Sequence, residues 1–287
     1  MLGLIKAARP HQWVKNLFVL APLIFAKGLG DVSMMLRSGV AFFCFSFAAS
    51  AIYLLNDIAD VEADRAHPVK RNRPIASGAV SERSARTAMV VLALTALGVS
   101  AALGPWVAAM IGAYLLLNVA YTFRLKRVPY VDVLCIAAGF LLRVLAGTFA
   151  LQVEPTVYLL IVTFLLSLFL GFGKRMHELQ MDSGKSHRAV LESYSKKTLG
   201  SLLRLTAIAT TGTYVVYTLD PHTREFFGTD YLAASIVFVE FGVLRFMELV
   251  QDVEAADSPT EKMLKDVPFL LNLALWAVAV VVILYVT

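Results

Sequence analysis

Apolar stretches long enough to cross a bilayer recur along the whole chain and are separated by short polar segments. A membrane-spanning helix needs about 20 mostly apolar residues. The pattern predicts an all-α, polytopic membrane protein with about nine transmembrane helices in a single bundle. The expected helices cover residues 14–29, 33–57, 84–104, 106–125, 131–151, 156–178, 197–219, 231–250 and 267–286.

The composition agrees with one membrane domain over residues 1–287. Hydrophobic residues make up 58% of the chain and charged residues 16%, whereas soluble domains are about 45–50% apolar and about 25% charged. A soluble enzyme and a disordered chain are therefore both disfavoured. Cys44 and Cys135 lie in apolar runs, so we expect small buried residues rather than a disulfide or a metal pair.

The basic residues predict the orientation of the chain in the membrane. They gather in the loops 58–83, 125–130, 179–196 and 251–266 and in the first residues, while only Lys27, Arg37 and Arg224 fall on the other side of the membrane. Lys and Arg mark cytoplasmic loops, so we expect the N-terminus inside, the C-terminus outside and a functional site on the cytoplasmic face. The net charge of +5 is then explained by the orientation of the chain in the membrane, and no nucleic-acid partner is expected.

An acidic motif follows directly on the second apolar stretch. Asn56, Asp60 and Asp64 are spaced by four residues, so a continued helix places them on one stripe, with Asp57 beside it. Carboxylates crowded at a membrane edge repel one another unless a hard cation lies between them. Mg²⁺ uses few carboxylates together with waters and substrate phosphates, so the stripe favours a magnesium–diphosphate site. The alternative is a solvated acidic helix end.

Basic residues on the same side are candidates for binding phosphate groups. The segment 67–74 follows the acidic stripe, and Arg73, which precedes Pro74, is expected to be better fixed than Lys70 or Arg71. Positive-inside topology and snorkelling to the interface are the alternative explanations for these residues. The candidates for phosphate binding are Lys15, Lys70, Arg73, Tyr121, Lys126, Lys174 and Arg175.

A second, sparser acidic motif ends the sixth apolar stretch. Glu178 and Asp182 are again spaced by four residues and follow Lys174 and Arg175. Within the apolar stretches, Arg143, Arg204 and Glu240 are expected to face the bundle interior and a partner, because a charge facing lipid is costly. The segment 171–173, Gly-Phe-Gly, is expected to serve helix packing.

The two motifs and the helix count resemble the UbiA superfamily of intramembrane prenyltransferases. The stretches that carry the resemblance are 9–16, 53–57, 60–65, 67–68, 73–76, 173–175, 178–179 and 191–194. Within the superfamily they resemble the branch that transfers phosphoribosyl groups to decaprenyl phosphate. Two departures fit that branch: the second motif has Glu178 where Asp is common, and four residues separate Tyr121 from Lys126 where three are common.

The resemblance implies a reaction, a cofactor and a location. A 5-phosphoribosyl group passes from 5-phosphoribosyl diphosphate to a polyprenyl phosphate lipid, diphosphate leaves, and the product serves cell-wall arabinan synthesis. Asn56, Asp60 and Asp64 are the implied catalytic residues and hold Mg²⁺, with Asp57, Glu178 and Asp182 as further candidate ligands. The enzyme is expected in the bacterial inner membrane, with the loops 56–83 and 174–197 forming its cytoplasmic site. The sequence leaves a homo-oligomer open.

Two other functions are compatible with the same residues. A prenyltransferase that moves a prenyl chain from its diphosphate to an aromatic or other small acceptor would use the same acidic stripe. A transporter or channel would need polar residues across the whole bilayer, whereas the charges here concentrate on one side.

Overall fold

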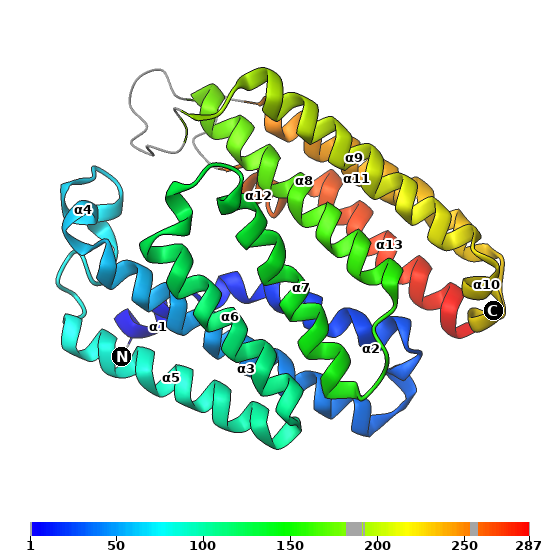
Figure 1. Cartoon of the computed structure of the whole chain (residues 1–287), viewed down its shortest axis with the longest axis horizontal. Coiled ribbons are helices and arrows are strands. Elements are labelled where there is room, and N and C mark those ends of the chain that lie inside the picture. The colour runs from blue at the N-terminus through cyan, green and yellow to red at the C-terminus, as the bar shows by residue number, and fades with distance from the viewer. Residues whose placement is uncertain (1, 182–190, 192, 253–257, 287) are drawn as a thin grey trace. The chain divides into compact units, whose positions relative to one another are not determined.

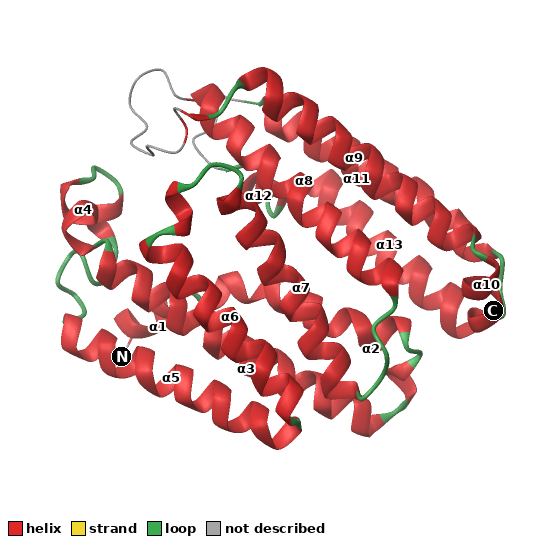
Figure 2. Cartoon of the chain, viewed as in Figure 1, coloured by secondary structure: helices red, strands yellow, loops and turns green. Residues whose placement is uncertain are grey.

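The computed structural model describes residues 2–181, 191, 193–252 and 258–286, and these residues form helices and loops without any strand (Figures 1 and 2). They form two compact units. The first unit comprises Met1–Leu125 with Leu141–Pro155, and the second comprises Lys126–Phe140 with Thr156–Thr287. Helix α7, Val131–Leu151, contributes its first half to the second unit and its second half to the first.

The first unit is built around the long helix α3. Its elements are α1 Leu2–Ala8, η1 Pro10–Leu20, α2 Ala21–Phe25, η2 Gly28–Gly30, α3 Val32–Ala59, α4 Val61–Ala66, η3 Lys70–Asn72, α5 Glu82–Leu103 and α6 Pro105–Phe123. Helix α3 begins at an N-cap, where the Asp31 carboxylate accepts from the N–H groups of Ser33 and Met34. It packs against η1, α5 and α6 around a core that includes Phe45, Ile111 and the second half of α7.

The second unit is a bundle of helices that run past one another in alternating directions (Figure 1). Its elements are η4 Leu125–Arg127 (of which Leu125 belongs to the first unit), α8 Val157–Met181, α9 Lys196–Leu219, α10 Pro221–Phe227, η6 Tyr231–Ser235, α11 Ile236–Gln251, α12 Pro259–Met263 and α13 Val267–Val286. Gly173 lets α8 approach α11 closely, because an added Cβ would lie 2.5 Å from Phe246. An added Cβ at Gly171 would likewise lie 2.6 Å from Val133, so the expected packing role of 171–173 is confirmed.

Six helices of the described residues, α3, α5, α6, α7, α8 and α13, are long and apolar enough to cross a membrane. Helix α9 follows the expected bounds, whereas the expected helix 231–250 is divided into the 3₁₀ helix η6 over Tyr231–Ser235 and α11 over Ile236–Gln251; α9 and α11 both fall outside that set. The expectation of one regular helix over 14–29 is wrong, because this segment is the 3₁₀ helix η1 followed by the short α2. Pro22 has no N–H to continue an α-helical ladder.

The 3₁₀ geometry of η1 directs every third side chain toward α3. A period of three residues aligns Trp13, Asn16 and Val19 on one edge. Trp13 donates to Ser50 (3.0 Å) and Asn16 to Ser46 (3.0 Å), both on α3, while Val19 is fully buried. The segment is thereby fixed antiparallel to α3, and its start, next to Arg9, lies near the first acidic motif.

Candidate active site

The first acidic motif lies where α3 passes into α4. The helical hydrogen-bond pattern continues through the junction, since Asp60 N–H donates to the Asn56 carbonyl (2.9 Å) and Asp64 N–H donates to the Asp60 carbonyl (2.8 Å). Asp60 itself departs from helical geometry, with φ −100° and ψ 12°. The four-residue spacing therefore gives the expected succession of oxygen side chains along one nearly continuous helix.

Two carboxylates of this motif are buried and held by arginines. Asp57 Oδ1 accepts from Arg9 (2.5 Å) and from Arg73 (3.2 Å), and Asp64 Oδ2 accepts from Arg73 (2.6 Å). The side chains of Asp57 and Asp64 are 1% and 4% exposed, whereas Arg9 and Arg73 remain 25% and 31% exposed. The arginines therefore join the buried acids to the open side of the site.

Arg9 reaches Asp57 from a left-handed backbone conformation, φ 52° and ψ 58°, between α1 and η1. This conformation costs a residue with a Cβ about 1 kcal/mol. Its guanidinium also lies over the Tyr53 ring, 5.1 Å from the centroid. Arg9 was not among the site residues predicted from the sequence, although it lies in the stretch 9–16 that contributes to the family resemblance. Its ion pair with Asp57 makes it part of the candidate site.

The remaining residues of the first motif are oriented differently. Asn56 Oδ1 accepts a hydrogen bond from the Thr122 hydroxyl on α6 (2.5 Å), and Asp60 is half-buried. Lys70 and Arg71 are exposed on η3. The expectation that Arg73 is better fixed than its two basic neighbours is confirmed.

The second unit contains a buried charged cluster at the second motif. Asp132 and Arg175 are 0% and 1% exposed, and Arg175 Nε lies 2.7 Å from Asp132 Oδ2, close enough for an ion pair but not aligned as a hydrogen bond. Arg175 also donates to Glu178 one turn further along α8. Two expected site residues, Arg175 and Glu178, are thus brought together, with Arg175 neutralised by carboxylates.

Asp132 connects this cluster to Tyr194. The Tyr194 hydroxyl donates to Asp132 Oδ1 (2.5 Å) and accepts from the Tyr130 N–H (2.7 Å). Burial, and then the hydrogen bond to the Asp132 carboxylate, raise the pKa of the Tyr194 phenol well above its usual value. Asp132 was not predicted as a site residue. The feature of the sequence that could have indicated it is an acidic residue near the start of the apolar helix α7.

The other expected residues occupy separate places. Lys15 on η1, Tyr121 near the end of α6, Lys126 on η4 and Lys174 on α8 are each half-buried. Tyr121 belongs to the first unit and Lys126 to the second. Asp182, the second acid of the second motif, lies outside the described residues.

The oxygen atoms of the first motif decide whether it can hold Mg²⁺. Within the described ranges, no three His, Cys, Asp or Glu side chains gather closely enough to form a protein-only cage. Asp57 Oδ2 is buried and accepts no hydrogen bond from any described residue, so one carboxylate oxygen at the first motif is left for a ligand. A small set of carboxylate and amide oxygens fits Mg²⁺ whose shell is completed by water and substrate phosphate.

The charges within the apolar stretches separate into two classes. Arg143 is buried as expected: it donates to Asn16 (2.8 Å) and Tyr114 (3.2 Å) and lies over the Phe45 ring, 5.0 Å from the centroid. Arg204 and Glu240 are exposed on α9 and α11, so the expectation that they face the interior is wrong. Both occupy outer helix faces, and Arg204 is one turn from a glycine.

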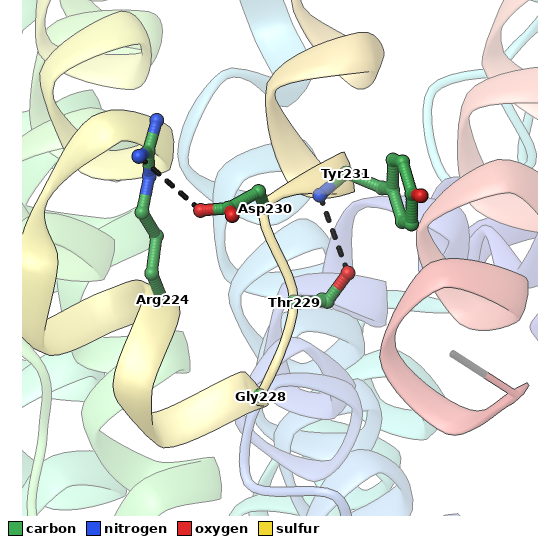
Figure 3. A pocket seen from close by; sticks show the side chains of 5 residues that line it. All are labelled: Arg224, Gly228, Thr229, Asp230 and Tyr231. Atoms are coloured by element: carbon green, nitrogen blue, oxygen red, sulfur yellow. Dashed lines mark hydrogen bonds and ion pairs between the residues drawn. The ribbon is translucent and has the colours of Figure 1, made fainter.

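Among the described residues of the second unit, two cavities have no expected site residue in their lining. The cavity of Figure 3, about 480 Å³, lies beside α10 and is lined by Arg224, Gly228, Thr229, Asp230 and Tyr231. Its arginine pairs with Asp230 at 3.2 Å. The other cavity, about 350 Å³, lies among α8, α9 and α11.

Comparisons with known proteins agree on one family. Residues 16–273 match the UbiA prenyltransferase family. The chain is 37% identical over 270 residues to the decaprenyl-phosphate phosphoribosyltransferase of Mycobacterium tuberculosis H37Rv, and the alignment covers 92% of this chain and 88% of the relative. It is 35% identical over 290 residues to the protein of the same name from Corynebacterium glutamicum, and that alignment covers 99% of this chain and 87% of the relative.

The fold has solved counterparts. A UbiA homolog from Archaeoglobus fulgidus bound to DMAPP and Mg²⁺ superposes with a TM-score of 0.75 at 18% identity over 99% of both chains. The same homolog bound to GPP and Mg²⁺ gives a TM-score of 0.75 at 17% identity, over 98% of this chain and 99% of that one. The predicted all-helical, UbiA-like fold is confirmed, and with it a multi-pass membrane protein.

Proposed function

The chain belongs to the UbiA prenyltransferase family, and we propose that it transfers a 5-phosphoribosyl group from 5-phosphoribosyl diphosphate to decaprenyl phosphate. The observation that carries the proposal is the 35–38% identity, over nearly all of the chain, to relatives named for this reaction. We place the enzyme in a bacterial inner membrane with its N-terminus and active site on the cytoplasmic side. Its product would serve cell-wall arabinan synthesis.

The reaction needs positioning and charge stabilisation more than a general base. A lipid phosphate is already an anion at neutral pH, so its oxygen attacks the anomeric carbon as the bond to the diphosphate breaks. The ribosyl carbon passes through an oxocarbenium-like state, as in glycoside hydrolysis. Direct displacement inverts the anomeric configuration. Fixed charges that hold donor and acceptor in line therefore supply most of the catalysis.

In our proposal the first motif receives the donor diphosphate. Asn56, Asp60 and Asp64 would hold Mg²⁺, with Asp57 in support. When bound, the ion would act as a Lewis acid that stabilises negative charge on the leaving diphosphate. Arg73 is well suited to bind a phosphate oxygen, because its guanidinium is tied to two buried acids yet remains 31% exposed.

The other basic candidates bind the remaining phosphates in this scheme. Lys126 and Lys174, two half-buried cations of the second unit, bind the donor 5-phosphate or the lipid phosphate. Lys15, Lys70 and Tyr121 are the proposed phosphate contacts of the first unit. Arg175 is 1% exposed and is held by Asp132 and Glu178, so it fixes the end of α8 that carries Lys174.

Labelled substrates test the proposal directly. Membranes containing the full chain are given radiolabelled 5-phosphoribosyl diphosphate, decaprenyl phosphate and Mg²⁺, and labelled lipid is expected. Parallel membranes receive a labelled prenyl diphosphate and an aromatic acceptor. Label in the prenylated aromatic product, with none in decaprenyl phosphate, would replace our proposal with the prenyltransferase alternative.

Matched variants separate the site from general disruption. Asp60→Asn should abolish labelled lipid and leave membrane insertion intact. Glu62→Gln is the control: this acid lies in the same motif, but its side chain is 80% exposed and pairs with Arg65. Full turnover in Asp60→Asn, or equal loss in both variants, would contradict the assignment of the motif.

A further inference from the structure

A cationic cavity lies at one end of the second unit, apart from the residues assigned to the reaction. About 350 Å³ in volume, it lies where α8 and α11 end and α9 begins. Its polar lining consists of Arg204, Gln180 and Gln251, and its apolar lining includes Met176 and Met247. The remaining lining residues are Gly200, Leu203 and Val250.

The cavity lies on a different side of α8 from the charged cluster. Met176 and Gln180 are four residues apart and share one face of the helix, whereas Arg175 and Glu178 are three apart and share another. Successive helical residues are turned by about 100°. The cavity is therefore a site of its own and does not extend the Asp132–Arg175 cluster.

Arg204 is directed toward the start of its helix. It lies eight residues after Lys196, about 12 Å along the axis, and side chains on a helix lean toward its N-terminus. An added Cβ at Gly200 would lie 3.9 Å from Arg204 Nη1 and 3.3 Å from Met176 Cε. The missing side chain at Gly200 thus makes room for the guanidinium to lie back over the preceding turn.

The surroundings of Arg204 are those of a lipid-facing surface. Leu205 and Ile208, on the same helix, are 62% and 72% exposed, and no carboxylate among the residues that the structure describes pairs with Arg204. Exposed leucine and isoleucine indicate contact with acyl chains, and a cation there favours an anionic partner. Lys196 and Lys197, exposed at the start of α9, add positive charge at the same end.

Gln180 indicates that the anionic partner also carries a hydrogen-bond donor. Its Oε1 atom is buried and accepts no hydrogen bond from the residues that the structure describes, and an unsatisfied buried acceptor is costly. A partner that satisfies the whole cavity would bring an anion for Arg204 and an O–H donor for Gln180. The apolar methionine side chains suit the first carbons of an acyl chain.

We propose that the cavity of Arg204, Gln180 and Gln251 binds a phospholipid whose headgroup carries a phosphate and a hydroxyl group. The phosphate contacts Arg204, a headgroup hydroxyl donates to Gln180 Oε1, and the acyl chains lie along α9. The site is independent of the proposed reaction, since it uses none of the residues assigned to the donor or the acceptor.

Native mass spectrometry of the full-length, detergent-purified protein tests the site with phosphatidylglycerol as the probe. Wild type should bind phosphatidylglycerol at least tenfold more tightly than phosphatidylcholine, whose headgroup offers no N–H or O–H. Arg204→Gln should weaken phosphatidylglycerol binding about tenfold, and Arg204→Lys, which keeps the charge, should weaken it less. Arg224→Gln is the matched control, because that arginine lines the other cavity of the same unit (Figure 3).

Gln180→Leu tests the hydroxyl contact separately. It should lower the affinity for phosphatidylglycerol and leave that for phosphatidic acid, which lacks the glycerol headgroup, unchanged. Equal binding by wild type and Arg204→Gln, or equal loss in Arg224→Gln, would overturn the proposal. Displacement of phosphatidylglycerol by decaprenyl phosphate, with a raised KM for that lipid in Arg204→Gln, would assign the cavity to the acceptor instead.

Discussion

Replacing Asp132 by asparagine should break contacts in the buried charged cluster of the second unit, although the two side chains have nearly the same shape. Asp132 carries three contacts at once: Oδ2 forms the ion pair with Arg175 (2.7 Å), and Oδ1 accepts from the Tyr194 hydroxyl (2.5 Å) and from the Val133 N–H (2.9 Å). An asparagine has one oxygen and an NH₂ group, so its oxygen can replace only one of the two carboxylate oxygens. Its NH₂ then faces a donor, either Arg175 Nε or the Val133 N–H.

The size of the effect follows from the burial of the partners. Both charged side chains are at most 1% exposed, and removing one partner of a buried pair costs about 3–5 kcal/mol. Glu178 still offers Arg175 a carboxylate from a 24% exposed position, so we expect the lower value, about 3 kcal/mol. At about 2–4 °C per kcal/mol for large chains, the melting temperature should fall on the order of 10 °C.

Thermal unfolding of the detergent-purified protein measures this effect, with Tyr194→Phe as the comparison. That variant loses two hydrogen bonds, one to Asp132 and one from the Tyr130 N–H, and keeps the charge pair, so it should cost about 1–3 kcal/mol. Because Arg175 adjoins Lys174, a proposed phosphate ligand on α8, Asp132→Asn should also raise the KM for 5-phosphoribosyl diphosphate more than it lowers kcat. A melting temperature within 2 °C of wild type would refute the account of Asp132 as the central acceptor of the cluster.

Three further outcomes follow from the described contacts. Asp64→Asn should abolish transfer in the labelled-lipid assay, and transfer by the wild-type protein should require Mg²⁺. Undiminished transfer by the wild-type protein after chelation of Mg²⁺ would contradict the metal assignment. Arg73→Ala should raise the KM for 5-phosphoribosyl diphosphate more than the KM for decaprenyl phosphate in steady-state kinetics; the reverse would move Arg73 to the acceptor. Because the pKa of Tyr194 is raised in the folded protein, the unfolded chain loses its proton first as pH rises above about 10. Stability should therefore fall above that pH, and less so in Tyr194→Phe, as measured by thermal melts from pH 8 to pH 11.

The helices were predictable because hydrophobic length dominates their formation in a membrane protein. Long apolar runs end at polar residues, and the bounds of α3, α7 and α13 agree with expectation within a few residues. The first segment was not predictable in the same way. Hydropathy does not distinguish a 3₁₀ helix from an α-helix, and the contacts of Trp13 and Asn16 with serines on α3 depend on tertiary packing.

The first motif was predictable because its residues are close in sequence. Spacing of four on a helix fixes the relation of Asn56, Asp60 and Asp64, and the backbone hydrogen bonds support it. Arg9 is 48 residues from Asp57, and Asp132 belongs to a different helix from Arg175. Local spacing contains no information on such pairs, so the partners of the acids required the three-dimensional structure.

The arginines also show why burial could not be assigned from hydropathy alone. Arg143 and Arg204 both interrupt apolar stretches, and the cost of a charge in lipid suggested the same interior position for each. Arg143 is satisfied by Asn16 and Tyr114, which supply polar atoms inside the first unit. Arg204 lies instead within about 12 Å of the helix start, where a long side chain can turn back over Gly200 toward the polar interface. Both arginines follow a glycine by one turn, Gly139 and Gly200, so it is the depth along the helix that distinguishes the outward arginine from the inward one.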